Sequence, residues 1–417
     1  MVRVLGLFTG SRIDVHMLFD PKRHEPLRAI AWDENRARAT IARVVRETES
    51  GFDDDAWWPM HPLDADGGPS APVFPLYFGA CGVIWALRYL AAVGAARPIR
   101  EYDDRVPRLL RLNRGWLEAS GSRDFASYLM GDTSILMLQH WLDPRAGVLD
   151  ELHRLIAENV DNPTRELLWG SPGTMLAASF LHEHTGEARF AELFRTTARK
   201  LESQLLHSDA CDCDYWTQDM YGRRTDYIDA VHGFVGTALP LIRGRHLLGE
   251  TEWRAWERRI VATVTHTAIR DGPLANWRPW LDPDRVDRVP LMQYCHGAPG
   301  FVVCLGDLPT TELDELLVAA GEAVWTAGPL RKGSNLCHGT AGNGCAFLKL
   351  HRRTGDAQWL DRARAFAMHA IGQFEEHASR YGQLRYSLWT GDLGLAIYLW
   401  NCIGAGAAFP TLDVFFA

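Results

Sequence analysis

The apolar positions of this chain recur at helical spacing over most of its length. In the segment after Gly355, seven apolar residues fall on one stripe: Trp359, Leu360, Ala363, Phe366, Ala367, Ala370 and Phe374. The pattern is repeated upstream by Leu313, Leu316, Leu317, Ala320 and Val324. Such a stripe predicts an amphipathic helix that buries one face. Since no run of alternating apolar and polar residues competes strongly for strand, the pattern predicts an all-α fold.

Other predicted helices are apolar nearly all round, as in residues 345–348 and 395–400. Helices of this kind must be covered on every side. They are opened by a Gly-x-x-Gly motif, which occurs at Gly79–Gly82, Gly170–Gly173, Gly233–Gly236, Gly297–Gly300, Gly339–Gly342 and Gly391–Gly394. A degenerate copy, Gly131-Asp132-Thr133-Ser134, lies between the first two. The sequence therefore contains seven repeats.

The repeat extends beyond its glycines. Residues 181–188 (Leu-His-Glu-His-Thr-Gly-Glu-Ala) resemble residues 350–357 (Leu-His-Arg-Arg-Thr-Gly-Asp-Ala), and Gly249 stands at the same interval in a third copy. The unit is thus an apolar helix, a turn at Thr-Gly-Asp/Glu and an amphipathic helix. Seven such hairpins can stack in an open solenoid or close into a ring. The apolar helices favour a closed double ring, with the glycine loops gathered at one rim.

The repeats occupy residues 76–417, and residues 1–75 are predicted to form an N-terminal arm packed on the ring. A helix is expected within Leu27–Glu49, where Ile30, Ala37, Ile41 and Val44 stand at helical spacing. A connector rich in Gly, Pro and Ser follows and ends at Pro75.

Composition and charge narrow the function. Of the 417 residues 47% are hydrophobic and 23% charged, as in ordinary globular proteins. The net charge of -8 argues against a nucleic-acid partner, because no basic surplus exists to neutralise phosphates. The most apolar stretch, Leu393 to Phe409, is interrupted by Asn401 and glycines, so it predicts a buried helix and packed tail; a membrane span needs about 20 apolar residues. The eight cysteines, some paired with histidine, point to a reducing cytoplasm.

Two Cys-His-Gly triplets, at residues 295–297 and 337–339, carry the candidate chemistry. Thiolate and neutral imidazole are ligands that zinc prefers. With both histidines bound, the site would be a closed, structural Cys2His2 site; with three ligands, it would keep a position open for a substrate thiol. Spacing alone leaves both arrangements open. Cys211 and Cys213 with His207 form a weaker metal candidate in a polar loop that has no second ligand pair.

These motifs resemble those of the lanthionine synthetase C-like (LanC-like) family, in the variant shared with eukaryotic members. The resemblance rests on the two triplets with their following glycines and on Trp58–Asp64, Glu166–Gly170, His232–Gly236, Ser387–Gly391 and Phe409-Pro410. It implies an (α/α) toroid of seven hairpins and a zinc ion held by Cys295, Cys337 and His338. It also implies a reaction in which a thiol attacks the β-carbon of dehydroalanine or dehydrobutyrine and forms a thioether.

The resemblance further implies catalytic roles beside the metal. His232 is expected to donate the proton that the substrate's α-carbon needs, and Glu166 to support that histidine. His296 is expected to stay off the zinc and to hydrogen-bond the substrate or share the proton transfer. His296 stands where many bacterial cyclases have Tyr, and Leu291 where they have Arg. Both departures weaken the case for cyclisation of a lantibiotic-like precursor.

Lys332 and Arg380 resemble positions that bind glutathione in eukaryotic members, and Arg385 is a rival for the second role. Two cations would suit a small peptide thiol with two carboxylates. The expected partners are therefore a dehydrated peptide or protein and, for intermolecular addition, glutathione or another small thiol. The alternative is a zinc- and thiol-binding adaptor without turnover. A toroid hydrolase would need paired carboxylates at the rim, and the sequence shows none at that spacing.

Overall fold

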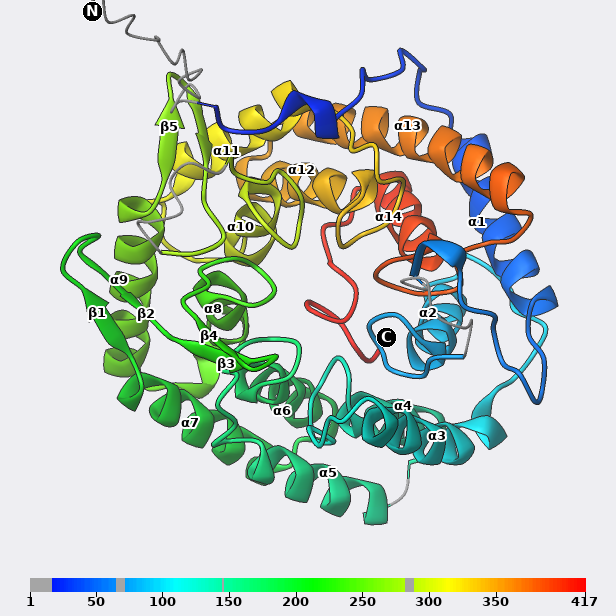
Figure 1. Cartoon of the computed structure of the whole chain (residues 1–417), viewed down its shortest axis with the longest axis horizontal. Helices are drawn as coiled ribbons and strands as arrows, with labels where there is room; N and C mark the ends of the chain where they lie inside the picture. Colours follow the sequence, from blue (N-terminus) through cyan, green and yellow to red (C-terminus); the bar gives the residue numbers. More distant parts are fainter. Residues whose placement is uncertain (1–16, 65–71, 145, 282–288) are drawn as a thin grey trace, which may run out of the picture.

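The computed structural model describes residues 17–64, 72–144, 146–281 and 289–417, in which fourteen α-helices form two concentric rings (Figure 1). The inner ring consists of α2 (Ala80–Ala92), α4 (Asp132–Leu142), α6 (Ser171–Thr185), α8 (Phe234–Arg243), α10 (Ala298–Leu305), α12 (Thr340–Thr354) and α14 (Asp392–Gly404). The outer ring consists of α1 (Glu34–Ser50), α3 (Val106–Ala119), α5 (Ala146–Glu158), α7 (Ala188–Ser203), α9 (Glu250–His266), α11 (Asp314–Ala327) and α13 (Ala357–Tyr381). Each inner helix contacts the next, and α14 contacts α2, so the ring is closed. The predicted toroid is confirmed.

The glycine motifs determine where the inner helices begin. The first glycine of every motif, including the degenerate copy, is the N-cap residue of an inner helix. In the six intact motifs, a Cβ on the second glycine would collide with the carbonyl oxygen six residues earlier, as at Gly82 and Leu76. This close approach requires a residue without a side chain. The seven predicted repeats therefore correspond to the seven inner helices.

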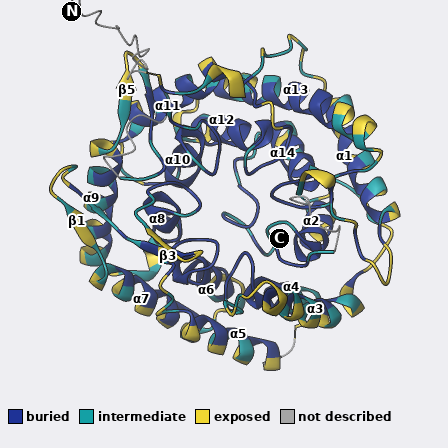
Figure 2. Ribbon diagram, viewed as in Figure 1, coloured by how far each residue is buried: buried dark blue, intermediate teal, exposed yellow. Residues whose placement is uncertain are grey.

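Burial follows the predicted pattern. The inner helices are buried along nearly their whole length, whereas the outer helices expose one face to solvent (Figure 2). In α13 the predicted stripe faces the core, with Trp359, Phe366 and Phe374 almost fully buried. The left-handed turns that end α6 and α12 lie at Gly186 and Gly355, each with φ 72°. The third copy departs from this pattern, since Gly249 is instead the N-cap of α9 with φ -68°.

One hairpin of the ring is built from the two ends of the chain. Among the described residues, the outer helix that packs against α14 is α1, which also contacts α13. The helix that was predicted within Leu27–Glu49 thus lies in the outer ring. Its helix begins at Glu34, because the Asp33 side chain accepts a hydrogen bond from Arg36 N and caps it. Ile30 therefore precedes the helix. Most of the predicted connector before Pro75 lies outside the described residues.

In the part of the chain that the structure describes, three short antiparallel hairpins interrupt the helical pattern. They pair β1 (Leu206–Ser208) with β2 (Cys213–Tyr215), β3 (Gln218–Met220) with β4 (Arg223–Thr225), and β5 (Ile269–Asp271) with β6 (Leu274–Asn276). The helical repeat pattern did not predict these hairpins, of which β5–β6 lies in the long interval between Gly233 and Gly297. A strand of three residues is too short to show a period-two pattern in the sequence.

The C-terminal tail runs into the centre of the inner ring (Figure 1). The Phe409 ring stacks on Tyr294 at 4.7 Å between centroids, and the Trp85 indole N–H donates to the Phe415 carbonyl at 2.9 Å. Asp413 pairs with the buried Lys349 ammonium of α12 at 2.7 Å. Leu393 to Phe409 is thus a buried helix and a packed tail, as predicted. Within the described ranges, no helix has the length and apolar character that crossing a bilayer requires.

Candidate metal centre

The loops that precede the inner helices are joined by backbone hydrogen bonds around one rim. The bonds run from Tyr77 N to Leu129 O, Leu129 N to Leu168 O, Leu167 N to Val231 O, Cys295 N to Cys337 O, Cys337 N to Trp389 O and Trp389 N to Tyr77 O. Six of the seven neighbouring loop pairs are linked in this way. The seventh pair, the loops before α8 and α10, is joined by Ile228 N donating to Pro279 O at 2.8 Å, by Leu281 N donating to Asp226 O at 3.1 Å, and by a side-chain bridge from Asp229 to His296.

The two Cys-His-Gly triplets lie on adjacent loops of this rim. The Cys295 and Cys337 thiols contact each other, and the Cys337 thiol also contacts the His338 imidazole. The Tyr77 hydroxyl donates to Cys337 Sγ at 2.7 Å, and the Gln293 amide donates to Cys295 Sγ at 2.9 Å. The adjacency of these two loops thus brings together the three side chains that the resemblance assigned to one site.

The surroundings of the two thiols shift their pKa values in opposite directions. The hydrogen bond from Cys295, followed by contacts with His338 and Tyr77, holds the pKa of Cys337 well below its usual range despite burial. The hydrogen bond to Cys337, together with burial, raises the pKa of Cys295. These surroundings therefore favour deprotonation of Cys337, next to His338, over that of Cys295.

The donor set fits zinc in kind and in proximity. Two thiols and one imidazole are the ligands of catalytic sites that keep a fourth position open. The three side chains touch in pairs but do not surround a common point: within the described residues, no group of three His, Cys, Asp or Glu side chains has the arrangement of a bound ion's ligands. The same holds for His207, which hydrogen-bonds Asp214 at 3.0 Å on the separate β1–β2 hairpin.

His232 and Glu166 form a buried pair on the neighbouring loops. His232 Nδ1 lies 3.1 Å from Glu166 Oε2, and the fully buried carboxylate also accepts from the backbone N–H groups of Leu168 and Trp169. Burial lowers the pKa of His232, but the Glu166 hydrogen bond and charge, helped by Asp229, outweigh it, and the net shift is upward from 6.5. The sequence-based pairing of these two residues is therefore present, and it favours a protonated imidazole.

His296 has a corresponding partner that sequence reasoning missed. Its Nδ1 lies 2.7 Å from Oδ2 of Asp229, whose other oxygen accepts from the backbone N–H of His232 at 2.7 Å. Asp229 is fully buried. A signal for it existed in the repeat: Asp229 stands four residues before Gly233, as Glu166 stands four before Gly170. The rings of His232 and His296 lie 6.4 Å apart, and Tyr227 contacts both.

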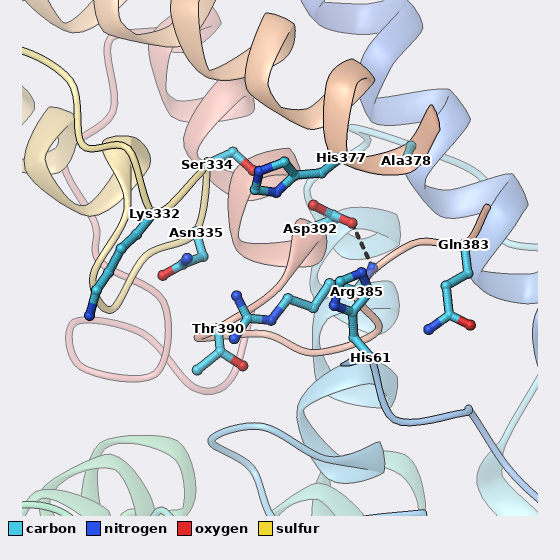
Figure 3. Close-up of a pocket in the computed structure, with 10 residues that line it drawn as sticks. All are labelled: His61, Lys332, Ser334, Asn335, His377, Ala378, Gln383, Arg385, Thr390 and Asp392. Atoms are coloured by element: carbon cyan, nitrogen blue, oxygen red, sulfur yellow. Dashed lines mark hydrogen bonds between the residues drawn. The ribbon is translucent and has the colours of Figure 1, made fainter. Parts of the chain in front are cut away.

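A narrow cleft adjoins the second triplet (Figure 3). Lys332 and Asn335 line it from the loop before α12, and Arg385 lines it from the loop before α14. The Asn335 Oδ1 accepts from His338 N at 3.0 Å, so this residue connects the cleft to the triplet. Its buried side-chain N–H group has no partner among the described residues. Arg380 is exposed near the end of α13 and does not line the cleft.

The cleft holds the cations Lys332 and Arg385 and the Asp392 carboxylate, whose pKa burial raises to about 6, but it has little enclosed space. Burial, with the Arg385 charge, lowers the pKa of His61 to about 4, and burial with the charges of Arg380 and Arg385 lowers that of His377. Both histidines are thus neutral near pH 7, and the cations are Lys332 and Arg385, the latter paired with Asp64 at 2.7 Å. The enclosed volume of about 10 Å³ holds about one water molecule. A tripeptide would have to lie across the mouth.

Comparisons with known proteins agree with this architecture. Residues 74–414 match the family described as lanthionine synthetase C-like protein. The chain is 28% identical over 257 residues to glutathione S-transferase LANCL1 of Danio rerio, covering 60% of this chain and 62% of that protein. It is 36% identical over 248 residues to LanC-like protein GCL1 of Arabidopsis thaliana, covering 56% and 54%. The matched regions thus span less than two thirds of either relative.

A solved structure of nisin cyclase shares the fold. It superposes with a TM-score of 0.58 at 15% sequence identity, covering 88% of this chain and 93% of that chain. At this identity the likeness concerns the arrangement of the helices.

Proposed function

Because the chain belongs to the lanthionine synthetase C-like family, we propose that it adds a thiol to dehydroalanine or dehydrobutyrine residues of a peptide or protein. Relatives named as a glutathione S-transferase and a cyclase support thiol addition at the level of the family. The observation that carries the proposal is the meeting of Cys295, Cys337 and His338 beside the His232–Glu166 pair.

The metal would be zinc, held by Cys295, Cys337 and His338. A zinc ion at this position would bind the attacking thiol as thiolate and lower its pKa. The chain's own residues orient the ligands: Tyr77 donates to Cys337 Sγ and Gln293 to Cys295 Sγ. Outer hydrogen bonds of this kind fix ligand direction in metal sites.

His232 would complete the addition. The thiolate sulfur forms a bond to the β-carbon, and the electron pair of the C=C bond moves toward the substrate carbonyl. The α-carbon then takes a proton from the imidazolium of His232. Glu166 favours that protonated form through its 3.1 Å hydrogen bond and its negative charge. A positioned acid of this type contributes about 10²–10⁴-fold to a rate.

Addition of a separate small thiol is favoured over cyclisation of the substrate's own cysteine. Lys332 and Arg385 stand beside the second triplet, and the unpartnered Asn335 N–H group adds a donor for a carboxylate or carbonyl. A peptide thiol with two carboxylates, such as glutathione, matches these groups. The second candidate is a zinc- and thiol-binding adaptor, which would need the same ligands and cleft but not His232.

A turnover assay separates these functions. Purified zinc-loaded protein is incubated with a peptide containing dehydroalanine and with glutathione, and the mass of the thioether adduct is followed with time. We expect catalysed adduct formation that falls about 10²–10⁴-fold in His232→Ala, while zinc content and glutathione binding are retained. An adaptor would bind zinc and glutathione equally well in both proteins and would show no turnover above the uncatalysed rate. Absence of turnover with every thiol donor would reject the enzymatic proposal.

A further inference from the structure

Side chains from one rim loop contact the histidine of the next loop in a regular way. The residue four positions before a motif glycine is Glu166, Asp229 or Gln293 in three successive loops. Glu166 hydrogen-bonds His232, and Asp229 hydrogen-bonds His296. Gln293 breaks the series, because its amide donates to the Cys295 sulfur.

The break leaves the two triplet histidines in different situations. Within the described residues, His338 has no carboxylate partner, and its ring contacts the Cys337 thiol. His296 is held at 2.7 Å by Asp229 and lies in ring contact with His232 and Tyr227. The two side chains follow identical Cys-His-Gly sequences, so the difference comes from the neighbouring loop.

Asp229 is a buried part of the rim and is held there by hydrogen bonds to the backbone. Its carboxylate is fully buried and also accepts from the backbone N–H groups of Val231 at 3.1 Å and His232 at 2.7 Å. The buried carboxylate accepts hydrogen bonds from three donors in this arrangement. If the His296 ring moved away, the carboxylate would lose one of these hydrogen bonds while remaining buried, which costs free energy. The hydrogen bond therefore resists rotation of the His296 ring toward the thiols.

We propose that Asp229 is a positioning residue that holds His296 off the metal and thereby keeps one coordination position free for the thiol substrate. This inference rests on the proposed zinc site. Without the carboxylate, the His296 ring would be free to turn and occupy the fourth position. The site would then become a closed Cys2His2 site of the structural type.

An opposite role for Asp229 makes an opposite prediction. Metal-bound histidines commonly donate their second ring N–H to a carboxylate, and loss of that carboxylate costs about 10–100-fold in metal affinity. If Asp229 supported His296 as a ligand, removing it would weaken zinc binding. If Asp229 withholds His296, removing it would strengthen zinc binding. The direction of the change thus decides between the two roles.

The variant to test is Asp229→Ser, because serine stands at the same repeat position in the loops before α4 and α14, as Ser127 and Ser387. Zinc affinity is measured by competition with a chelator, and X-ray absorption at the zinc edge counts sulfur neighbours with and without glutathione. For the unaltered protein we expect two sulfur ligands, rising to three with glutathione. For Asp229→Ser we expect zinc affinity about tenfold or more higher and no third sulfur.

Two further variants control the interpretation. The double variant Asp229→Ser/His296→Ala should regain uptake of a third sulfur, because the released imidazole is gone. Asp229→Asn keeps an oxygen for the backbone donors and a side chain long enough to hold the ring, so it should behave like the unaltered protein. His296→Ala alone gives a reading that does not depend on how Asp229→Ser folds: zinc affinity should stay unchanged, and a loss of tenfold or more would overturn the proposal.

The outcomes separate this inference from the function on which it rests. If the unaltered protein takes up no zinc, both fall. If it takes up zinc and a third sulfur, and Asp229→Ser does the same with unchanged or lower affinity, the zinc site stands and the role of Asp229 is overturned.

Discussion

The two Cys-His-Gly triplets are alike in sequence and differ in what surrounds them. Cys295 receives a hydrogen bond from the Gln293 amide, and His296 is tied to a carboxylate. Cys337 receives a hydrogen bond from a tyrosine hydroxyl, and His338 contacts the thiol beside it. In a ring of repeats, each loop is completed by its neighbours. The neighbouring loop, not the motif, thus decides which partner each histidine has.

The largest expected effect concerns the cysteine of each triplet, which both triplets are proposed to contribute to the zinc site. Cys295→Ala and Cys337→Ala should each lower zinc affinity by more than the 10–100-fold typical of outer-shell changes and should abolish thioether formation, since each removes one of three ligands. Metal analysis of the purified proteins measures this. Cys345→Ala, which removes a buried thiol within α12, is the matched control and should keep its zinc. Full zinc occupancy in either triplet variant would mean that the replaced cysteine is not a zinc ligand.

A second prediction sharpens the comparison of the two histidine–carboxylate pairs. Glu166→Gln removes the charge that raises the pKa of His232. An acid is lost as pH rises through its pKa, so lowering that pKa should move the falling basic limb of the pH–rate profile to lower pH. The variant should therefore lose activity mainly at pH values above its new basic limb, where less of the imidazole is protonated. Zinc content should not change. An unshifted basic limb would exclude His232 as the titrating acid.

A third and smaller effect concerns the cleft, which adjoins only the second triplet. Lys332→Ala should raise KM for glutathione by about fivefold or less and leave kcat unchanged, because an exposed charge contributes modestly to binding. Arg331→Ala is the control, since Arg331 is also exposed but does not line the cleft. The difference should shrink at high salt, where exposed charges are screened. Equal effects of the two variants would mean that the cleft does not bind the thiol donor.

Much of the fold could be predicted because it is local. Helical stripes, apolar inner helices and the glycines that begin them are visible within single repeats, and all seven repeats were found. The pairing of α1 with α14 could not be predicted, since nothing in either segment records that the ring closes between the chain ends. The three hairpins were missed because their strands contain only three residues each.

In the candidate site, too, the features visible within one repeat could be predicted, and those that depend on a distant loop could not. The two triplets are visible in the sequence itself, whereas His232 and Glu166 were assigned from the resemblance to the family, at positions beside two motif glycines. Asp229 was missed although it occupies the equivalent position, because its importance depends on the next loop, which lies more than sixty residues further along the chain. The choice of Arg380 over Arg385 rested on resemblance to a glutathione-binding position of eukaryotic family members, whereas Arg385 lines the cleft beside Lys332.

The most direct test of the division between the triplets is the zinc content of His338→Ala and His296→Ala, measured side by side with the unaltered protein. The account predicts that His338→Ala loses most of its zinc. It predicts that His296→Ala retains about one zinc per chain and forms the thioether about 100-fold more slowly, as expected for loss of one acid–base group. Equal loss of zinc in the two variants would mean that both histidines are ligands and that the site is closed, and the catalytic account would be contradicted.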